Sequence, residues 1–164
     1  PVTLIEYVDL QCPYCKQMEV GTLPDLLTRY VRSGKAKIVA RPLAFSSDSA
    51  RGRSAMIAAG LQNRAFNFAQ VLYLNQGTEN TGWLNDGMIA QAAASIPGLR
   101  VTDLLAARKA VGVSKVATQI DSIANTGRID ATPTFVIENG IGSKATLVAP
   151  SETALRAAID AALP

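Results

Sequence analysis

The feature that most constrains this chain is a pair of cysteines, Cys12 and Cys15, at the point where one sequence pattern gives way to another. The run from Val2 to Asp9 is apolar and rich in β-formers, which predicts a strand covered on both faces. From Pro13 onward the apolar residues recur at spacings of three and four, which predicts a helix of about five turns. Proline suits the first helical position because the N–H it lacks has no partner there. The chain is therefore expected to turn from a buried strand directly into a helix at the cysteine pair.

Later segments predict the rest of an α/β fold. The stretch from about residue 49 to 112 is rich in Ala and long side chains, and it predicts three helices. The order of elements is then β-α-β, a helical insert, and α-β-β-α. The supporting signals are a strand within Lys35–Phe45, a helix capped by Ser114, strands at Thr134–Glu138 and Lys144–Val148 joined by a turn at Asn139-Gly140, and a final helix opened by Pro150-Ser151-Glu152.

Length and composition favour one domain. The chain has 164 residues, of which 48% are hydrophobic, and this suffices for a single core. We expect one domain over residues 1–164 that carries a helical insertion at about 49–112. The net charge of +3 comes from scattered residues, so no nucleic-acid partner is expected. Because the sequence starts at Pro1 directly with a strand, we expect an export signal or a membrane anchor upstream of it.

The residue types exclude several kinds of site. The chain contains no His and two Cys, so a zinc site would lack two of its four usual ligands. Nucleophiles activated by a histidine base are excluded for the same reason. We therefore expect no metal and no cofactor other than a redox-active disulfide between Cys12 and Cys15.

A working redox pair is favoured over a structural staple. Closing so short a loop stabilises a chain by only about 2 kcal/mol. At the start of a helix, Cys12 faces unpaired N–H groups and the positive end of the helix dipole, and both favour a thiolate. Lowering a thiol pKa from about 8.5 to about 6 favours the reduced form by about 3.4 kcal/mol. Cys12 is thus the predicted nucleophile, with Cys15 on the same helix face.

Glu6 is the unusual residue of the first strand. Alternation places it on the same strand face as Leu4 and Val8, beneath the helix that carries the cysteines. Burial there would raise its pKa, and its predicted role is to exchange a proton with Cys15. The alternative is that Glu6 reaches solvent or pairs with a Lys, without a catalytic role.

Taken together, E-Y-V-D-L-Q-C-P-Y-C-K, the helices between Ser49 and Gly112, and A-T-P-T-F-V-I resemble the DsbA-like thiol:disulfide oxidoreductases of the thioredoxin superfamily. The resemblance spans nearly the whole chain and implies a thioredoxin-like fold with a cis bond before Pro133. It also implies that Pro13, Tyr14, Thr132 and Pro133 contact the substrate, with the Thr132 backbone binding an extended segment. An acidic residue six positions before the first cysteine is typical of the family, and Glu6 matches it.

The resemblance further implies a periplasmic or cell-envelope enzyme that donates its disulfide to reduced or misoxidised exported polypeptides. A membrane redox partner would reset the disulfide, and we expect a monomer. Tyr14 stands where well-known oxidants of this family carry His, so the direction of the reaction stays open between donor and reductase or isomerase. A thioredoxin-like module without redox activity, binding peptides or a small ligand, is the alternative from another class.

Overall fold

The computed structural model describes residues 1–142 and 144–164. Its four-stranded sheet has the order β2-β1-β3-β4, formed by Ala36–Pro42, Val2–Val8, Thr134–Glu138 and Lys144–Val148. β1 and β2 are parallel, whereas β3 is antiparallel to both β1 and β4. A parallel pair needs a crossover connection, and the helix that starts at Pro13 supplies it. The predicted order of the elements is confirmed.

The crossover helix has locally widened turns. It runs through α1 (Pro13–Gln17), η1 (Met18–Thr22), α2 (Leu23–Leu26) and η2 (Leu27–Val31), of which η1 and η2 are π-helical. Pro24 has no N–H to donate to the carbonyl of Val20, and the wide turn of η1 lies directly before it. The helix of about five turns is thus present as one continuous helical stretch.

The insertion holds one helix more than the sequence predicted. Its helices are α3 (Ser47–Gly60), α4 (Ala65–Leu74), α5 (Asp86–Ala94) and α6 (Val101–Ala107). α5 and α6 are separate because Gly98 has φ +78°, a conformation that favours glycine and ends the helical run. The prediction of Ser114 as a helix cap was wrong. α7 (Val111–Thr126) begins after Ala110, so Ser114 lies in its first turn.

The predicted antiparallel pair near the C-terminus is confirmed, with Thr134 opposite Val148 and Glu138 opposite Lys144. The connection is longer than the two-residue turn expected at Asn139-Gly140, because pairing stops at Glu138 and resumes at Lys144. Part of it, Ser143, lies outside the described residues. The final helix, α8, spans Glu152–Ala162 and is capped by the Ser151 side chain, as predicted.

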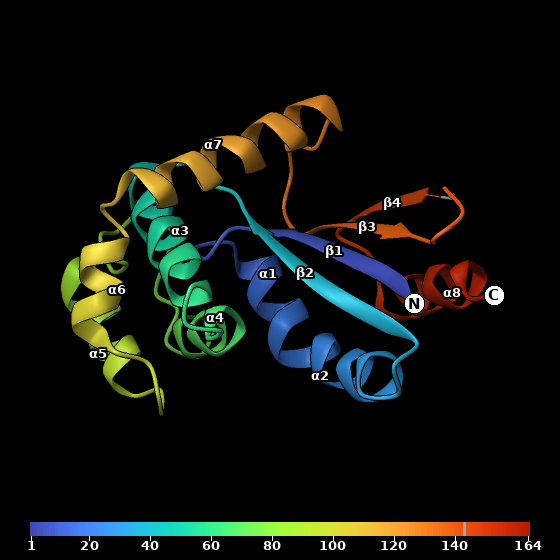
Figure 1. Ribbon diagram of the computed structural model, residues 1–164, viewed down its shortest axis with the longest axis horizontal. Coiled ribbons are helices and arrows are strands. Elements are labelled where there is room, and N and C mark those ends of the chain that lie inside the picture. Colours follow the sequence, from blue (N-terminus) through green and yellow to red (C-terminus); the bar gives the residue numbers. More distant parts are fainter. Residues whose placement is uncertain (143) are drawn as a thin grey trace.

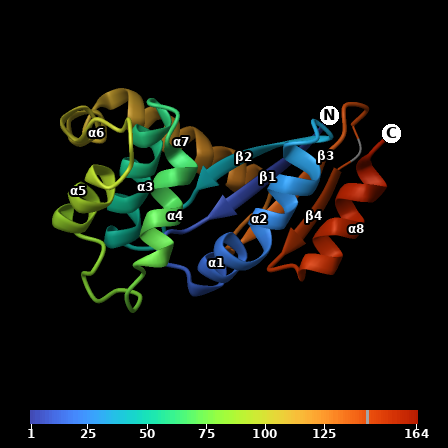
Figure 2. The ribbon, with the colours of Figure 1, turned by 90° about the horizontal axis from the view of Figure 1, so that it is seen from below.

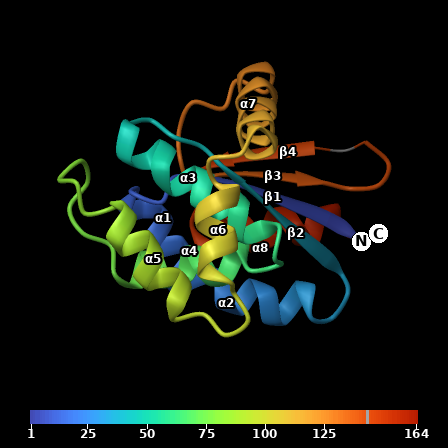
Figure 3. The same ribbon diagram turned by 60° about the vertical axis from the view of Figure 1, so that its left-hand side comes forward.

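The helices cover both faces of the sheet (Figures 1 and 2). α2 and α8 lie on one face and α7 lies on the other, while α3 to α6 gather at the end of the sheet where β1 leads into α1. Figure 3 brings this insertion forward, with the sheet behind it. The cysteine loop therefore lies between the sheet and the insertion.

Successive side chains of β1 point to opposite faces of the sheet, so they belong to different parts of the core. Leu4 packs with Leu26 and Phe135 beneath α2 and α8, whereas Ile5 packs with Ile120 beneath α7. A third cluster joins Val8 and both cysteines to the insertion through buried residues such as Phe68, Leu72 and Leu84. Glu6 therefore faces the crossover helix, as the strand pattern predicted. Within the described part of the chain, no helix is long and apolar enough to cross a membrane.

Candidate active site at the strand-helix junction

Cys12 caps the first helix. Its backbone is extended (φ −69°, ψ 120°), and its Sγ accepts a hydrogen bond from the Cys15 N–H at 3.4 Å. A turn closed by the Cys12 N–H and the Asp9 carbonyl at 3.0 Å brings the chain from β1 to this position. Pro13 fills the first helical position, so it leaves no amide unpaired. The sulfur thus lies at the end of the helix where unpaired amides point.

These contacts make the two thiols unlike each other. The pKa of Cys12 is lowered from 9.0 to about 6, chiefly by a hydrogen bond with the Cys15 side chain; partial burial opposes this, and the amides of Cys15 and Tyr14 add to the lowering. The pKa of Cys15 is raised, chiefly by burial and then by its hydrogen bond to Cys12 and the charge of Cys12. Both cysteines are free, with Cys12 7% exposed and Cys15 1% exposed. The sequence predicted that the start of the helix favours the Cys12 thiolate. In the structure, the hydrogen bond from the Cys15 thiol lowers the pKa of Cys12 more than the backbone amides do.

Thr132 and Pro133 lie against the cysteine pair although 120 residues separate Thr132 from Cys12. The Thr132-Pro133 peptide bond is cis, as the family resemblance implied. The Cys12 thiol donates to the Thr132 carbonyl oxygen at 3.4 Å. The Pro133 carbonyl accepts from the Ala149 N–H at 2.8 Å, which ties the segment to the end of β4. The cis peptide thus forms the opposite wall of the site.

Two hollows flank Tyr14, whose side chain is 63% exposed. One, of about 180 Å³, is bordered by Pro133, Met18 and Ser151. The other, of about 300 Å³, is bordered by Cys12, Pro13, Phe45, Glu79, Asp130 and Thr132 among others. The four predicted substrate-contacting residues, Pro13, Tyr14, Thr132 and Pro133, therefore all lie along a surface that passes over the Cys12 sulfur.

Glu6 is 1% exposed and has a buried second carboxyl group as neighbour, Glu19 of η1. Burial raises the pKa of Glu6 well above its ordinary value, and the charge of Glu19 raises it further. Burial also raises the pKa of Glu19 to about 7. The Glu6 Oε2 atom has no hydrogen-bond partner among the described residues, which suits a carboxyl group that is neutral. The structure gives no direct contact between Glu6 and Cys15.

Sequence reasoning missed three residues of this site. Glu19 stands four residues after Cys15, a spacing that places both on one helix face and could have revealed it. Tyr73 of α4 is fully buried and donates to the Asp9 carbonyl at 3.2 Å. Burial raises its pKa, as do the nearby charges of Cys15, Glu19 and Glu6. Gln76 donates to the carbonyls of Leu10 and Cys12 at 2.9 and 3.1 Å. No local pattern marks Tyr73 or Gln76.

Ligands for a metal are not assembled here. In residues 1–142 and 144–164, no three side chains of His, Cys, Asp or Glu come together as a metal site would require.

The asymmetry of the thiols gives a direct prediction. The rate at which iodoacetamide alkylates Cys12 in the reduced protein should rise with a midpoint near pH 6, because the thiolate is the reactive form. A Cys15→Ala variant loses the strongest hydrogen bond to that sulfur, so its midpoint should lie at higher pH. Peptide mapping by mass spectrometry identifies the modified residue. Equal alkylation of both cysteines, or a midpoint near that of a free thiol, would contradict this assignment.

The buried carboxyl pair should make stability depend on pH. The pKa of Glu19 is near 4.5 in the unfolded chain and about 7 in the folded chain. Its contribution to the stability of the folded state is therefore complete below pH 4.5 and is lost as the pH rises through about 7. Glu19→Gln should therefore reduce the fall in the free energy of unfolding between pH 5 and pH 8, by up to about 3 kcal/mol. Urea denaturation measures this, with surface Glu152→Gln as the control. If Glu19→Gln leaves the pH dependence of the free energy of unfolding unchanged, Glu19 ionises as readily in the folded chain as in the unfolded chain.

The chain is similar to known proteins in both sequence and structure. A family model described as thioredoxin matches residues 1–161. The chain is 28% identical over 92 residues to the probable disulfide bond formation protein D of Bacillus cereus, a match that covers 54% of this chain and 43% of that protein. The matched part thus spans less than half of that relative's length.

Among solved structures, BdbD from Bacillus subtilis in its oxidised form has a TM-score of 0.86 at 18% identity, over 98% of this chain and 86% of that one. DsbA2 from Pseudomonas aeruginosa has a TM-score of 0.71 at 26% identity, and the match covers 97% of this chain and 87% of that one. With a family model that matches nearly every residue, and with a fold similar to DsbA proteins, the chain belongs to the thioredoxin family.

Proposed function

We propose that the protein is a thiol:disulfide oxidoreductase that donates a Cys12–Cys15 disulfide to cysteines of exported polypeptides. The observation that carries the proposal is the unequal pair: Cys12 borders an open hollow and has a pKa of about 6, whereas Cys15 is more deeply buried and has a raised pKa. A staple needs neither the lowered pKa nor the open surface around Cys12. The name of the Bacillus cereus relative, a probable disulfide bond formation protein, supports the same function.

The exchange has two steps. A substrate thiolate attacks Cys12 Sγ of the oxidised pair, the Cys12–Cys15 bond breaks, and Cys15 leaves with the electron pair and takes up a proton. A second substrate thiolate then attacks the substrate sulfur of the mixed disulfide, and Cys12 leaves as a thiolate. The substrate loses two electrons and the protein gains them. Cys12 is the better leaving group in the second step because its pKa is the lower one.

The direction of the reaction follows from the stability of that thiolate. A thiol with a pKa of about 6 is about nine-tenths ionised at pH 7, whereas an ordinary thiol is only a few per cent ionised. Ionisation stabilises the reduced pair and makes its disulfide more oxidising. This supports donation, and a reductase or isomerase using the same pair is the alternative. Equilibration with glutathione separates them, since a donor titrates toward about −120 mV and a reductant toward about −270 mV.

The setting that we propose follows from the family resemblance. Reduced or misoxidised exported polypeptides are the substrates, a membrane redox partner resets the disulfide, and the protein works as a monomer in the periplasm or cell envelope. An extended substrate segment lies along Tyr14 and the Thr132-Pro133 peptide, where two hollows flank Tyr14 and the larger one is lined by Cys12.

Two cysteine variants test the central proposal. Cys12→Ser should have no detectable activity in oxidising a reduced dithiol peptide, because no sulfur remains at the accessible position. Cys15→Ser, mixed with a disulfide-linked dimer of a peptide that carries one cysteine, should accumulate a mixed disulfide: the Cys12 thiolate attacks one sulfur of the dimer, the other half leaves as a thiolate, and no Cys15 thiol is present to release the bound half. Non-reducing gels and mass spectrometry detect both outcomes. If Cys12→Ser keeps its function, or if the parent turns over no thiol, the binding-module alternative is favoured.

We further propose that Glu6 exchanges a proton with Cys15. The support is the burial of Glu6, its raised pKa and its position on the strand beneath the cysteine helix. Glu6→Gln should slow attack by Cys15 on the mixed disulfide at least tenfold near pH 7. Rapid quenching with acid measures this rate. Alkylation of Cys12 serves as the internal control, because this step needs no proton from Cys15. Unchanged resolution across the pH range would remove Glu6 from the mechanism.

A further inference from the structure

The larger hollow beside Cys12 has an acidic rim. Cys12, Pro13 and Thr132 line it on the side of the cysteine helix, and Glu79 and Asp130 line it from two other loops. Glu79 belongs to the insertion, on the loop between α4 and α5, whereas Asp130 follows α7. The hollow is about 300 Å³ in volume. A substrate bonded to the Cys12 sulfur must therefore pass close to both carboxylates.

These two carboxylates differ from the others in the chain, which has thirteen Asp and Glu residues. Seven form ion pairs with Lys or Arg, namely Asp25, Asp48, Asp86, Asp103, Asp121, Glu138 and Glu152. Four others are buried or accept hydrogen bonds, namely Glu6, Asp9, Glu19 and Asp160. Glu79 and Asp130 are exposed and have no ion pair or hydrogen bond with any described residue. Both of them line the hollow over Cys12.

The loop that carries Glu79 is fixed to the cysteine loop. The Gln11 side chain donates to Asn80 Oδ1 at 3.4 Å and accepts from the Asn80 N–H at 3.0 Å. Gln76 donates to the carbonyls of Leu10 and Cys12. The amide next to Glu79 in sequence is therefore held by a buried glutamine. The loop that carries Glu79 is therefore held in place without a substrate, so binding does not have to offset an entropy cost of ordering this loop.

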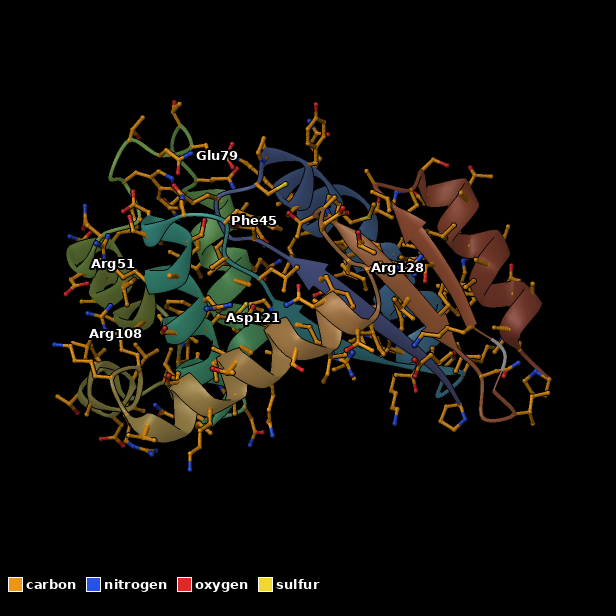
Figure 4. The ribbon with its side chains drawn as sticks, turned by 90° about the horizontal axis from the view of Figure 1, so that it is seen from above. Phe45, Arg51, Glu79, Arg108, Asp121 and Arg128 are labelled. Atoms are coloured by element: carbon orange, nitrogen blue, oxygen red, sulfur yellow. The ribbon has the colours of Figure 1, made fainter. Side chains whose placement is uncertain are left out.

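Aromatic surface completes the hollow. Phe45, 59% exposed, and Tyr14, 63% exposed, both line it. Figure 4 shows Phe45 and Glu79 near each other, whereas Arg128 lies farther away, beside the sheet. No Lys or Arg is among the described residues that line the hollow. Aromatic faces next to carboxylates suit the aliphatic stem and cationic head of Lys or Arg.

We propose that this hollow selects substrates in which a Lys or Arg flanks the reactive cysteine. The occupant is an extended, reduced polypeptide segment, and the cation next to its cysteine lies between Glu79 and Asp130 while its thiolate attacks Cys12. Attraction between the cation of the substrate and the two carboxylates speeds the association of substrate and protein and fixes how the substrate segment is aligned on the surface. A substrate with an acidic residue beside its cysteine is repelled. This inference rests on the proposed function, because it assigns the substrate preference of the same site.

The test uses short peptides that are identical except that their single cysteine is flanked by Lys on both sides or by Glu on both sides. Each peptide thiol reduces the oxidised protein to a mixed disulfide at Cys12, which acid quenching and mass spectrometry measure. Each rate is divided by the rate of the same peptide with neutral 2-hydroxyethyl disulfide, which removes differences between the peptide thiols. The Lys peptide should then react about tenfold faster, and 1 M salt should abolish most of this ratio.

Two double variants with the same change in net charge identify the carboxylates responsible. Glu79→Gln with Asp130→Asn should bring the ratio close to one. Asp103→Asn with Glu138→Gln removes two carboxylates outside the hollow and should keep the parent ratio. Equal rates for the two peptides in the parent, or equal losses in both double variants, would overturn the proposal.

Failure of the proposed function looks different, because then neither peptide nor dithiothreitol reduces the cysteine pair. In that case the charge preference is measured on reduced Cys15→Ser with cationic and anionic methanethiosulfonates, in which the Cys12 thiolate forms the new S–S bond and a sulfinate leaves. The cationic reagent should react about tenfold faster, and this preference should be lost in the variant that also carries Glu79→Gln and Asp130→Asn. Equal reactivity of the two reagents would refute the acidic subsite independently of turnover.

Discussion

The site depends on where the first helix begins. Cys12 ends the extended segment after β1, and its sulfur takes the position of a capping side chain at the start of α1. The Cys15 amide and thiol both point toward that sulfur because they lie one helical turn further on. A polar cap of this kind usually serves to stabilise a helix. Here the capping atom is also the proposed nucleophile, so the contacts that start the helix also lower the pKa of that thiol.

Everything else in the site either encloses this sulfur or connects it to the core. The Thr132 carbonyl reaches it from the segment before β3, and Tyr14 remains exposed beside it. Beneath it, Cys15 is sealed among apolar residues of the insertion, in the same cluster as Phe68 and Leu72. This placement between two parts of the fold leaves Cys12 at the edge of an open hollow and buries Cys15 more deeply. The proposed exchange needs both conditions, since substrate must reach one thiol and not the other.

The insertion covers the cysteine pair and also supplies polar contacts to the cysteine loop. Gln76 and Asn80 hydrogen-bond to the cysteine loop, and Tyr73 extends the buried polar region that contains Glu6 and Glu19. Buried polar groups are costly unless they are satisfied, and here burial raises the pKa of Glu6, Glu19 and Tyr73. The same insertion carries Glu79 to the rim of the substrate surface. The insertion thus brings Tyr73 to the buried carboxyl groups of β1 and η1 and Glu79 to the rim of the hollow, whereas Asp130 reaches that rim from the loop after α7.

The sequence by itself determined the strands, the helix that starts at Pro13, the order of elements and the position of the cysteine pair at the start of that helix, because these depend on local periodicity and on residues only a few positions apart. It also placed Glu6 on the correct strand face, since alternation is a local property. It did not determine the fourth helix of the insertion, the start of α7, or the contacts of Tyr73, Gln76, Glu79 and Asp130. The break between α5 and α6 depends on the backbone conformation of Gly98, whereas the contacts of Tyr73 and Gln76 depend on how segments 64 or more residues away in the chain pack against the cysteine loop. Only the tertiary structure decided them, because packing between distant segments leaves no periodic signal in either segment alone.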